Sequence, residues 1–209
     1  MLIAMDGPAA SGKGTLAKKL AGHYGLAHLD TGSLYRAVAR DILTAGKALD
    51  DEAAAADAAQ SLESGTLNDP ALRTPEVGQA AARVAKIGAV REALFKFQRV
   101  FASRREGAII EGRDIGTVVC PEADVKIFVE ASTDVRAERR YKELMEVGHD
   151  ISYEEIHAQI AARDEADRSR AISPLRPAED AHLLDTSDLG IEAAFKAAVK
   201  LIDTAISQA

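Results

Sequence analysis

The sequence predicts an α/β fold with a parallel sheet of five strands. Short apolar runs of strand length alternate with longer segments in which apolar residues recur every three or four positions. Strands that alternate with helices along a chain are typical of a parallel sheet with helices on both faces. The predicted strands are the apolar run before Gly7 and residues 26–29, 108–110, 125–129 and 183–184.

The first strand runs directly into a glycine-rich segment. Gly7, four further residues, Gly12 and Lys13 have the spacing of a phosphate-binding loop, and a helical pattern begins at Leu16. Glycine lets backbone N–H groups turn towards a polyphosphate, while the helix N-terminus and Lys13 add positive charge. The alternative is a strand-to-helix turn that binds nothing, but the flanking strand and helix favour phosphate binding. The residues expected to hold the phosphates are Gly7, Pro8, Ala9, Ala10, Ser11, Gly12, Lys13, Gly14 and Thr15.

The residue after the lysine departs from the usual loop pattern. A Ser or Thr whose hydroxyl coordinates magnesium normally follows, whereas here Gly14 follows and the hydroxyl comes one place later, at Thr15. Magnesium that enters with a nucleotide needs few protein ligands. Thr15, and Glu111 at the end of the third strand, are the candidates for holding the ion or its waters. The five histidines are scattered without metal-ligand spacing, so a structural zinc is not expected.

The segment between the second and third strands is predicted to be helical. Asp30 to Ser33 is typical of a helix cap, and the helix that follows should end near Gly46. The alanine-rich stretch 50–60 favours a helix by propensity, and the proline-containing stretch 64–75 favours a loop. Residues 84–101 are expected to form one or two helices, with a possible break at Gly88.

Helices are also predicted after the third and fourth strands. Ser132 is a candidate helix cap, and Ser152 with Glu155 forms a capping-box pattern. An amphipathic helix from about Ile191 closes the chain. Helix-covered parallel sheets bind ligands beyond the carboxyl ends of their strands, where the glycine-rich loop and Asp30 fall.

Composition excludes several classes of protein. A chain of 209 residues with 47% apolar and 28% charged residues can bury the core of one domain. No run approaches the roughly 18 apolar residues of a membrane span, and no signal-peptide pattern begins the chain, so we expect a cytosolic protein. Cys120 is the only cysteine, which excludes an intrachain disulfide and favours a buried structural thiol. The net charge of −7 argues against broad nucleic-acid binding.

Two arginines stand at strand ends. Arg36 lies just inside the helix after the second strand, and Arg113 follows the third strand. The guanidinium fork matches phosphate oxygens, and both arginines fall at the sheet edge that carries the phosphate loop. Phosphate binding is therefore favoured over the alternative that both are solvated surface residues.

The helix from Ser152 carries a stripe that begins apolar and becomes charged. At about 100° per residue its members share one face. They are Ile156, Ile160, Arg163, Asp167 and Arg170. The charged end is expected to face a cleft; alternatively, it leaves the body and its charges are in solvent. Asp164 and Arg168 lie to one side, where only a surface pair is expected.

The preceding helix carries Arg136, Arg139 and Arg140 on one face. An arginine face opposite an apolar face is common on surface helices. Arginines on a closing lid would also stabilise the charge of a transferring phosphoryl group and exclude water. The pattern leaves both interpretations open.

Five motifs in order along nearly the whole chain resemble bacterial cytidylate kinases. They are Gly-Pro-Ala-Ala-Ser-Gly-Lys-Gly-Thr at 7–15, Leu-Asp-Thr-Gly-Ser-Leu-Tyr-Arg at 29–36, Val-Arg-Glu-Ala-Leu at 90–94, Glu-Gly-Arg-Asp-Ile-Gly-Thr-Val-Val at 111–119 and Arg-Asp-Glu-Ala-Asp-Arg-Ser-Arg at 163–170. The resemblance implies a P-loop kinase with one domain over 1–209, a monophosphate-binding lobe at about 32–104 and a helical lid at about 140–175. It implies transfer of the γ-phosphoryl group of ATP, with Mg²⁺, to CMP or dCMP by a monomer. Gly-Lys-Gly-Thr is also the form that this kinase group uses.

The resemblance also implies a role for individual residues. Arg36 and Arg113 would hold the acceptor phosphate, with Thr31 and Tyr35 lining that site. Arg91 and Asp114 would contact the cytosine, Arg163 and Asp167 the ribose, and Arg170 the phosphates. The candidate catalytic residues are Lys13, Arg136, Arg140 and Arg170.

Two features depart from the family pattern. Ala82 stands nine residues before Arg91, where many members have a serine that contacts the base, so one hydrogen bond to the pyrimidine is in question. Residues 64–75 look too short and proline-broken for the small β-sheet insert that many members carry in the monophosphate lobe. How that lobe closes is therefore open.

Two alternatives are weighed against this activity. One is a P-loop kinase for another acceptor, such as UMP, AMP or shikimate. The other is a nucleotide-operated switch, which is disfavoured because Asn68, the only asparagine, is followed by Asp, so no Asn-Lys-x-Asp signature occurs, and Asp-x-x-Gly is also absent.

Overall fold

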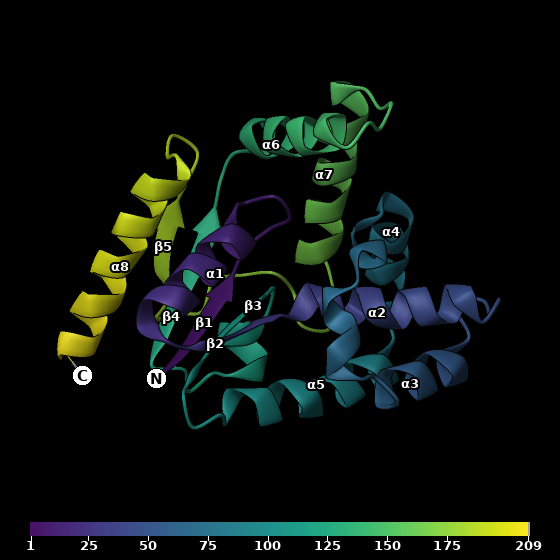
Figure 1. Cartoon of the computed structure of the whole chain (residues 1–209), viewed down its shortest axis with the longest axis horizontal. Helices are drawn as coiled ribbons and strands as arrows, with labels where there is room; N and C mark the ends of the chain where they lie inside the picture. The colour runs from purple at the N-terminus through teal and green to yellow at the C-terminus, as the bar shows by residue number, and fades with distance from the viewer. Residues whose placement is uncertain (209) are drawn as a thin grey trace. The chain divides into compact units, whose positions relative to one another are not determined.

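A computed structural model, which describes residues 1–208, confirms the predicted α/β class (Figure 1). Its five strands form one parallel sheet in the order β2-β3-β1-β4-β5. The strands are β1 (Leu2–Asp6), β2 (Ala27–Asp30), β3 (Ala108–Gly112), β4 (Val125–Glu130) and β5 (His182–Asp185). All five predicted strands are present, and the last four differ from their predicted bounds by one or two residues at an end.

The chain divides into two compact units. The first contains residues 1–28 and the chain from Arg104 onward, and the second contains Leu29–Ser103.

Helices α1 (Lys13–Tyr24) and α8 (Ile191–Gln208) pack on one face of the sheet in the first unit. Ile3 and Met5 of β1 point into this core and are fully buried. Because side chains alternate along a strand, Asp6 points to the opposite face. The β1–β4 register places Ala4 beside Lys126, so these residues share the face of Asp6.

Helices α6 (Thr133–Glu146) and α7 (Tyr153–Arg168) pack against each other in the same unit (Figure 1). Their shared core consists of Ala137, Leu144, Ile156 and Ile160. Both predicted caps are confirmed: the Ser132 side chain accepts from Val135 N, and Ser152 and Glu155 form a capping box.

A short π-helical turn at Ile115–Val119 lies between β3 and β4 and was not predicted from the sequence. Its wide backbone loops are closed by hydrogen bonds from Val119 N to Asp114 O and from Cys120 N to Ile115 O. Turns of this kind often occur at functional sites. Cys120 is buried and forms no disulfide, as expected for a structural thiol.

The second unit is helical beyond the end of β2. Its helices are α2 (Thr31–Thr44), α3 (Glu52–Gln60), α4 (Pro75–Val84) and α5 (Gly88–Ala102). The loop predicted at 64–75 is more ordered than expected, since it contains two short 3₁₀ helices, Ser64–Asn68 and Pro70–Arg73. The Asp69 side chain caps the second of these by accepting from Ala71 N, and it also binds Arg40. Between residues 31 and 103 the structure contains no strand.

No helix among residues 1–208 has the length and hydropathy required to cross a membrane.

Candidate active site

The segment Gly7–Gly12 turns tightly between β1 and α1. Gly7 has a φ of 153°, and a Cβ at this position would lie 2.0 Å from the carbonyl oxygen of Val129 in β4. Gly12, the N-cap of α1, has a φ of 83°, and Ala10 also has a positive φ of 59°. The loop is therefore held in a shape that its glycines make possible, with the α1 N-terminus at its end.

Two polar groups in this loop fit a phosphate ligand. Ser11 is 1% exposed, and its Oγ has no hydrogen-bond partner in the structure. The ammonium group of Lys13 lies over the loop and donates to the carbonyl oxygen of Pro8 at 3.2 Å. A buried hydroxyl without a partner costs free energy unless a ligand supplies one, and phosphate oxygens accept hydrogen bonds well. The loop therefore fits the phosphates of a nucleotide.

The position of Gly14 has a structural explanation. A Cβ at Gly14 would lie 3.3 Å from both carboxylate oxygens of Glu111. Glu111 is 4% exposed, and its Oε1 lies 2.9 Å from Nε2 of His28. A serine or threonine at position 14 would crowd this carboxylate, so Glu111 stands beside the place where other phosphate loops have their metal-binding hydroxyl. Thr15, the other candidate for the metal, is exposed in the first turn of α1.

Arg113, Asp167 and Arg170 form one charged cluster. Arg113 follows β3 and its Nε donates to Asp167 Oδ2 at 2.8 Å, while Arg170 Nη2 donates to Asp167 Oδ1. Asp167 is 2% exposed. Burial raises its pKa, but the charges of Arg113 and Arg170 outweigh that effect and hold the pKa below its usual value. The carboxylate is thus ionised and keeps two arginines side by side, near Arg163, which also lowers its pKa.

The stripe on α7 is therefore only partly as expected. Ile156 and Ile160 are buried against α6, and Asp167 with Arg170 joins the cluster at Arg113. The predicted surface pair of Asp164 and Arg168 is wrong. Asp164 is 3% exposed and points at α6, because it is the partner of Arg136.

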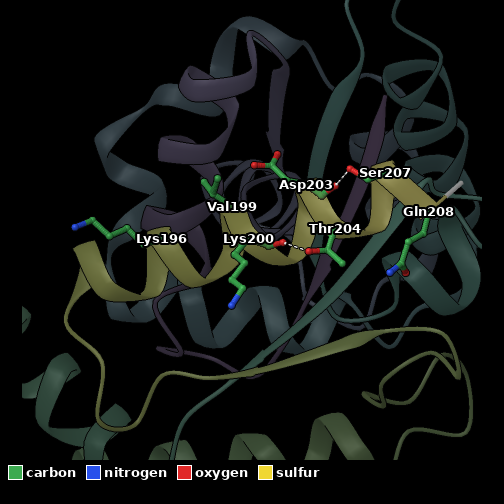
Figure 2. Close-up of a pocket in the computed structure, with 7 residues that line it drawn as sticks. All are labelled: Lys196, Val199, Lys200, Asp203, Thr204, Ser207 and Gln208. Carbon is green, nitrogen blue, oxygen red and sulfur yellow. Dashed lines mark hydrogen bonds between the residues drawn. The ribbon is translucent and has the colours of Figure 1, made fainter.

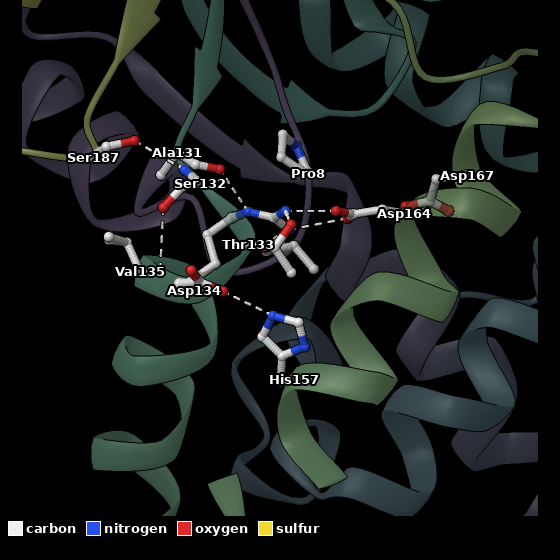
Figure 3. A network of polar contacts seen from close by, with 12 residues as sticks. Pro8, Ala131, Ser132, Thr133, Asp134, Val135, His157, Asp164, Asp167 and Ser187 are labelled. Atoms are coloured by element: carbon white, nitrogen blue, oxygen red, sulfur yellow. Dashed lines mark hydrogen bonds and ion pairs between the residues drawn. The ribbon is translucent and has the colours of Figure 1, made fainter. Parts of the chain in front are cut away.

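Arg136 is 2% exposed, although the sequence placed it on a basic helix face. Its Nη1 and Nη2 donate to the two carboxylate oxygens of Asp164 at 3.0 and 2.5 Å, and its Nε donates to Ala131 O at 2.8 Å (Figure 3). Nη1 also lies 3.3 Å from the carbonyl oxygen of Ala9 in the phosphate loop. This buried pair joins α6, α7 and the loop.

Arg139 and Arg140 differ from Arg136 and from each other. Arg139 Nη2 donates to Thr186 O at 2.6 Å, and Thr186 Oγ1 lies 3.1 Å from Ser11 O. Arg139 thus ties the chain after β5 to the phosphate loop. Arg140 is half-exposed, and within residues 1–208 its ion pair is with the exposed Glu143, at 2.7 Å.

Asp114 occupies the position directly before the π-helical turn, where its side chain makes no capping hydrogen bond, and it is buried, with 7% of its surface exposed. Its position directly after Arg113 puts both residues between the end of β3 and the turn. Asp6, which was not among the predicted site residues, binds the first two N–H groups of the turn. An acidic residue at a strand end beside the glycine-rich loop was the only sequence signal for it.

In the second unit, Asp30, Thr31, Tyr35 and Arg36 gather at the start of α2. Asp30 caps the helix by accepting from Ser33 N, and its Oδ2 also accepts from Arg36 Nη2 at 2.5 Å. The Nε of Arg36 is buried and without a hydrogen-bond partner. Arg91 of α5 donates from Nη1 to the Tyr35 hydroxyl at 3.3 Å. The helix start therefore presents an arginine with an unused donor beside Thr31, which is buried.

Other parts of the described chain contain fewer features of a functional site. Among residues 1–208 no group of three or more His, Cys, Asp or Glu side chains has the arrangement of a metal site. A shallow depression of about 480 Å³ runs along α8 and is lined by residues such as Lys196, Lys200 and Asp203 (Figure 2). It shares no residue with the phosphate loop or the arginine clusters.

Comparisons with known proteins identify the family. Residues 3–204 match the family model described as cytidylate kinase. The chain is 55% identical over 207 residues to the cytidylate kinases of Brucella suis biovar 1 and Brucella abortus strain 2308, covering 99% of this chain and 94% of each relative.

Solved structures agree on the fold alone. An uncharacterized protein from Eubacterium ventriosum matches with a TM-score of 0.56 and 16% identity, covering 97% of this chain and 98% of that one. A sugar kinase from Janibacter sp. matches with a TM-score of 0.50 and 15% identity, covering 96% and 93%. From the family model and the curated relatives, the chain belongs to the cytidylate kinase family.

Proposed function

We infer that this enzyme transfers the γ-phosphoryl group of ATP to CMP or dCMP and releases ADP with CDP or dCDP. The observation that carries this conclusion is 55% identity to cytidylate kinases across 99% of the chain. The phosphate loop, with Ser11 Oγ unpaired and Gly14 beside Glu111, gives the reaction a physical basis. No observation favours UMP, AMP or shikimate as the acceptor, or a switch without an acceptor.

We propose that Gly7–Thr15 binds the phosphates of ATP. Backbone N–H groups of the loop and the α1 N-terminus would contact the phosphate oxygens, and Lys13 would exchange its bond to Pro8 O for one to the outer phosphates. Transfer of a phosphoryl group needs positioning and positive charge more than covalent chemistry. We therefore assign Lys13 to charge stabilisation, with in-line transfer and no covalent intermediate.

We propose Mg²⁺ as the companion of ATP. Bound magnesium neutralises phosphate charge during such transfers. Glu111, oriented by His28, and the hydroxyl of Thr15 are the oxygen donors on this chain that would hold the ion or its waters.

The acceptor-binding roles follow the family pattern and stay proposals. In the first unit, Arg113 would hold the phosphate of CMP and Asp114 would accept from the cytosine. In the second unit, Arg36 would use its unpaired Nε on the phosphate, with Thr31 and Tyr35 nearby and Arg91 on the base. Ala82 of α4 offers no hydroxyl to the pyrimidine, so discrimination among bases would depend more on Arg91 and Asp114.

On α7 and the segment after it, Arg163 and Asp167 would contact the ribose and Arg170 the phosphates. Asp167 would keep Arg170 and Arg113 oriented through its two ionised oxygens. Arg140, held only by an exposed partner, would be able to turn towards the transferring group. Arg136 is committed to Asp164, so we assign it to positioning the phosphate loop through Ala9.

The activity is tested by measuring ADP formation from ATP and magnesium with CMP, dCMP, UMP, AMP, GMP, shikimate or no acceptor. We expect strong stimulation by CMP and dCMP only. Stimulation by a different acceptor would move the substrate assignment, and hydrolysis without any acceptor would support the switch. We also propose a monomer located in the cytoplasm, which gel filtration and cell fractionation would test.

A further inference from the structure

Asp6 connects two parts of the site. It is the last residue of β1, directly before Gly7, and it is 5% exposed. Its Oδ1 accepts from the N–H of Ile115 at 2.8 Å, and its Oδ2 accepts from the N–H of Gly116 at 2.7 Å. Ile115 and Gly116 are the first two residues of the π-helical turn, which directly follows Arg113 and Asp114. One carboxylate therefore links the strand before the phosphate loop to the turn after the proposed acceptor-binding residues.

The turn is also fixed from its other side. A Cβ at Gly116 would lie 3.4 Å from Asp6 Oδ2 and 3.2 Å from Cδ of Lys126. The ammonium group of Lys126 is held by both carboxylate oxygens of Asp180, at 2.9 and 2.7 Å. Gly116 thus lies between the Asp6 carboxylate and the Lys126 side chain, with little room to shift.

The ionised form of Asp6 is destabilised by its burial. Burial raises its pKa to about 6 against the lowering effect of the two N–H groups; Asp114 raises the pKa further and Lys13 lowers it. A residue that stability alone would disfavour in its charged form often serves function. No neutral side chain of this size offers two acceptors to two adjacent N–H groups, since the amide of Asn has only one oxygen.

We propose that Asp6 is a positioning residue for the acceptor: by binding the N–H groups of Ile115 and Gly116, it fixes the orientation of Arg113 and Asp114 towards CMP. The inference rests on the proposed acceptor roles of those two residues. Asp6 itself contacts no substrate. The strand that leads into the ATP-binding loop therefore also sets the geometry of the acceptor side.

The test is a two-substrate kinetic comparison of the wild-type enzyme with Asp6→Asn. The amide nitrogen would face one of the two N–H donors, so the turn loses a hydrogen bond and shifts. Since a hydrogen bond to a charged group is lost, we expect the KM for CMP to rise about tenfold or more. The KM for ATP should rise less than the KM for CMP, because the backbone N–H groups that would bind the ATP phosphates are unaltered and the variant removes only the charge of Asp6 that acts on Lys13.

Asp124→Asn is the matched control. Asp124 is exposed at the other end of β1, where its Oδ2 accepts from Leu2 N at 2.6 Å. We expect neither KM to change in this variant.

Gly116→Ala tests the same contact without removing the charge, and it decides the question if Asp6→Asn does not fold. Its methyl group would push the turn away from Asp6 or Lys126, so the KM for CMP should again rise more than that for ATP. Equal rises in both KM values, or an unchanged KM for CMP in a folded variant, would overturn the proposal. Asp114→Ala distinguishes a failure of the positioning role of Asp6 from a failure of the proposed acceptor-binding role of Asp114. If Asp114→Ala raises the KM for CMP while Asp6→Asn and Gly116→Ala do not, only the positioning role fails. If Asp114→Ala leaves the KM for CMP unchanged, the acceptor assignment itself fails.

Discussion

The Gly7–Gly12 loop and the α6–α7 pair keep their shapes by different physical means. The loop depends on backbone shape: Gly7 touches Val129 O with no room for a side chain, and Gly12 adopts a positive φ. The helix pair depends on buried charges, with Arg136 and Asp164 both less than 4% exposed and joined by two hydrogen bonds. An unusual backbone shape can be recognised in the sequence by its glycines. A buried charged residue, in contrast, does not reveal in the sequence which residue is its partner.

This difference predicts separable effects of mutation. Loop variants should lose ATP binding or turnover, and variants of the buried pair should lose stability first.

Lys13→Ala should have the largest effect on turnover. Lys13 is the side chain on the loop whose charge would meet the outer phosphates, and removing such a group from a phosphoryl-transfer site costs on the order of a thousandfold in rate. The melting temperature should stay near that of the wild type, because Lys13 is only half-buried and its hydrogen bond to Pro8 O is local to the loop. A variant with near-normal kcat would refute the assignment of the loop.

Asp164→Ala should give the largest loss of stability. It leaves the guanidinium of Arg136 buried without its carboxylate, and breaking a buried pair in this way costs about 3–5 kcal/mol. Urea unfolding followed by circular dichroism would measure the change.

Glu143→Ala is the control for that variant, because it breaks the exposed pair with Arg140. An exposed pair is worth less than about 1 kcal/mol, so this variant should unfold nearly as the wild type does. Equal losses in the two variants would mean that burial does not decide the strength of these pairs.

Gly7→Ala should cost about 3 kcal/mol, because the new methyl group overlaps Val129 O and forces β1 and β4 to shift. Gly22→Ala in α1 is the matched control. No atom lies within 4 Å of a Cβ at Gly22, and alanine favours a helix over glycine by about 1 kcal/mol, so this variant should be more stable than the wild type. Calorimetric melting of both variants would show opposite signs, and a stable, ATP-binding Gly7→Ala would contradict the steric argument.

The contribution of Asp167 to stability should depend on pH. Its pKa in the folded protein lies below the usual value, so the ionised form contributes stability above about pH 4 and this contribution is lost as the pH falls further. The difference in unfolding free energy between the wild type and Asp167→Asn should therefore shrink between about pH 5 and pH 3. A difference that stays constant over this range would show that the arginines around Asp167 do not stabilise its charge.

The sequence predicted the features that depend on local pattern. Apolar periodicity located all five strands, and the capping residues Ser132 and Ser152 placed the starts of α6 and α7. The loop was recognisable because its backbone demands glycine. The two 3₁₀ helices at 64–73 were missed, since a short helix of this kind has too few residues to show a period.

Contacts between residues that are far apart in the chain could not be predicted from the sequence. The spacing of Asp164 and Arg168 suggested a pair on one helix, but the partner of Asp164 is Arg136, 28 residues away. Asp6 and its two N–H donors are more than 100 residues apart. Apolar periodicity describes one helix or strand at a time, so it does not predict contacts between elements. The three-dimensional structure was also needed to show that a side chain at position 14 would crowd the carboxylate of Glu111.

In the proposed division of the site, Gly7–Thr15 binds ATP and a separate set of polar residues, with Asp114 among them, binds CMP. The most direct measurement is the steady-state activity of Asp114→Ala with CMP and with AMP, together with its KM for ATP. We predict a large drop in the preference for CMP over AMP, with the KM for ATP unchanged within about twofold. An unchanged ratio of CMP to AMP activity, or a parallel loss of ATP binding, would contradict this division of the site.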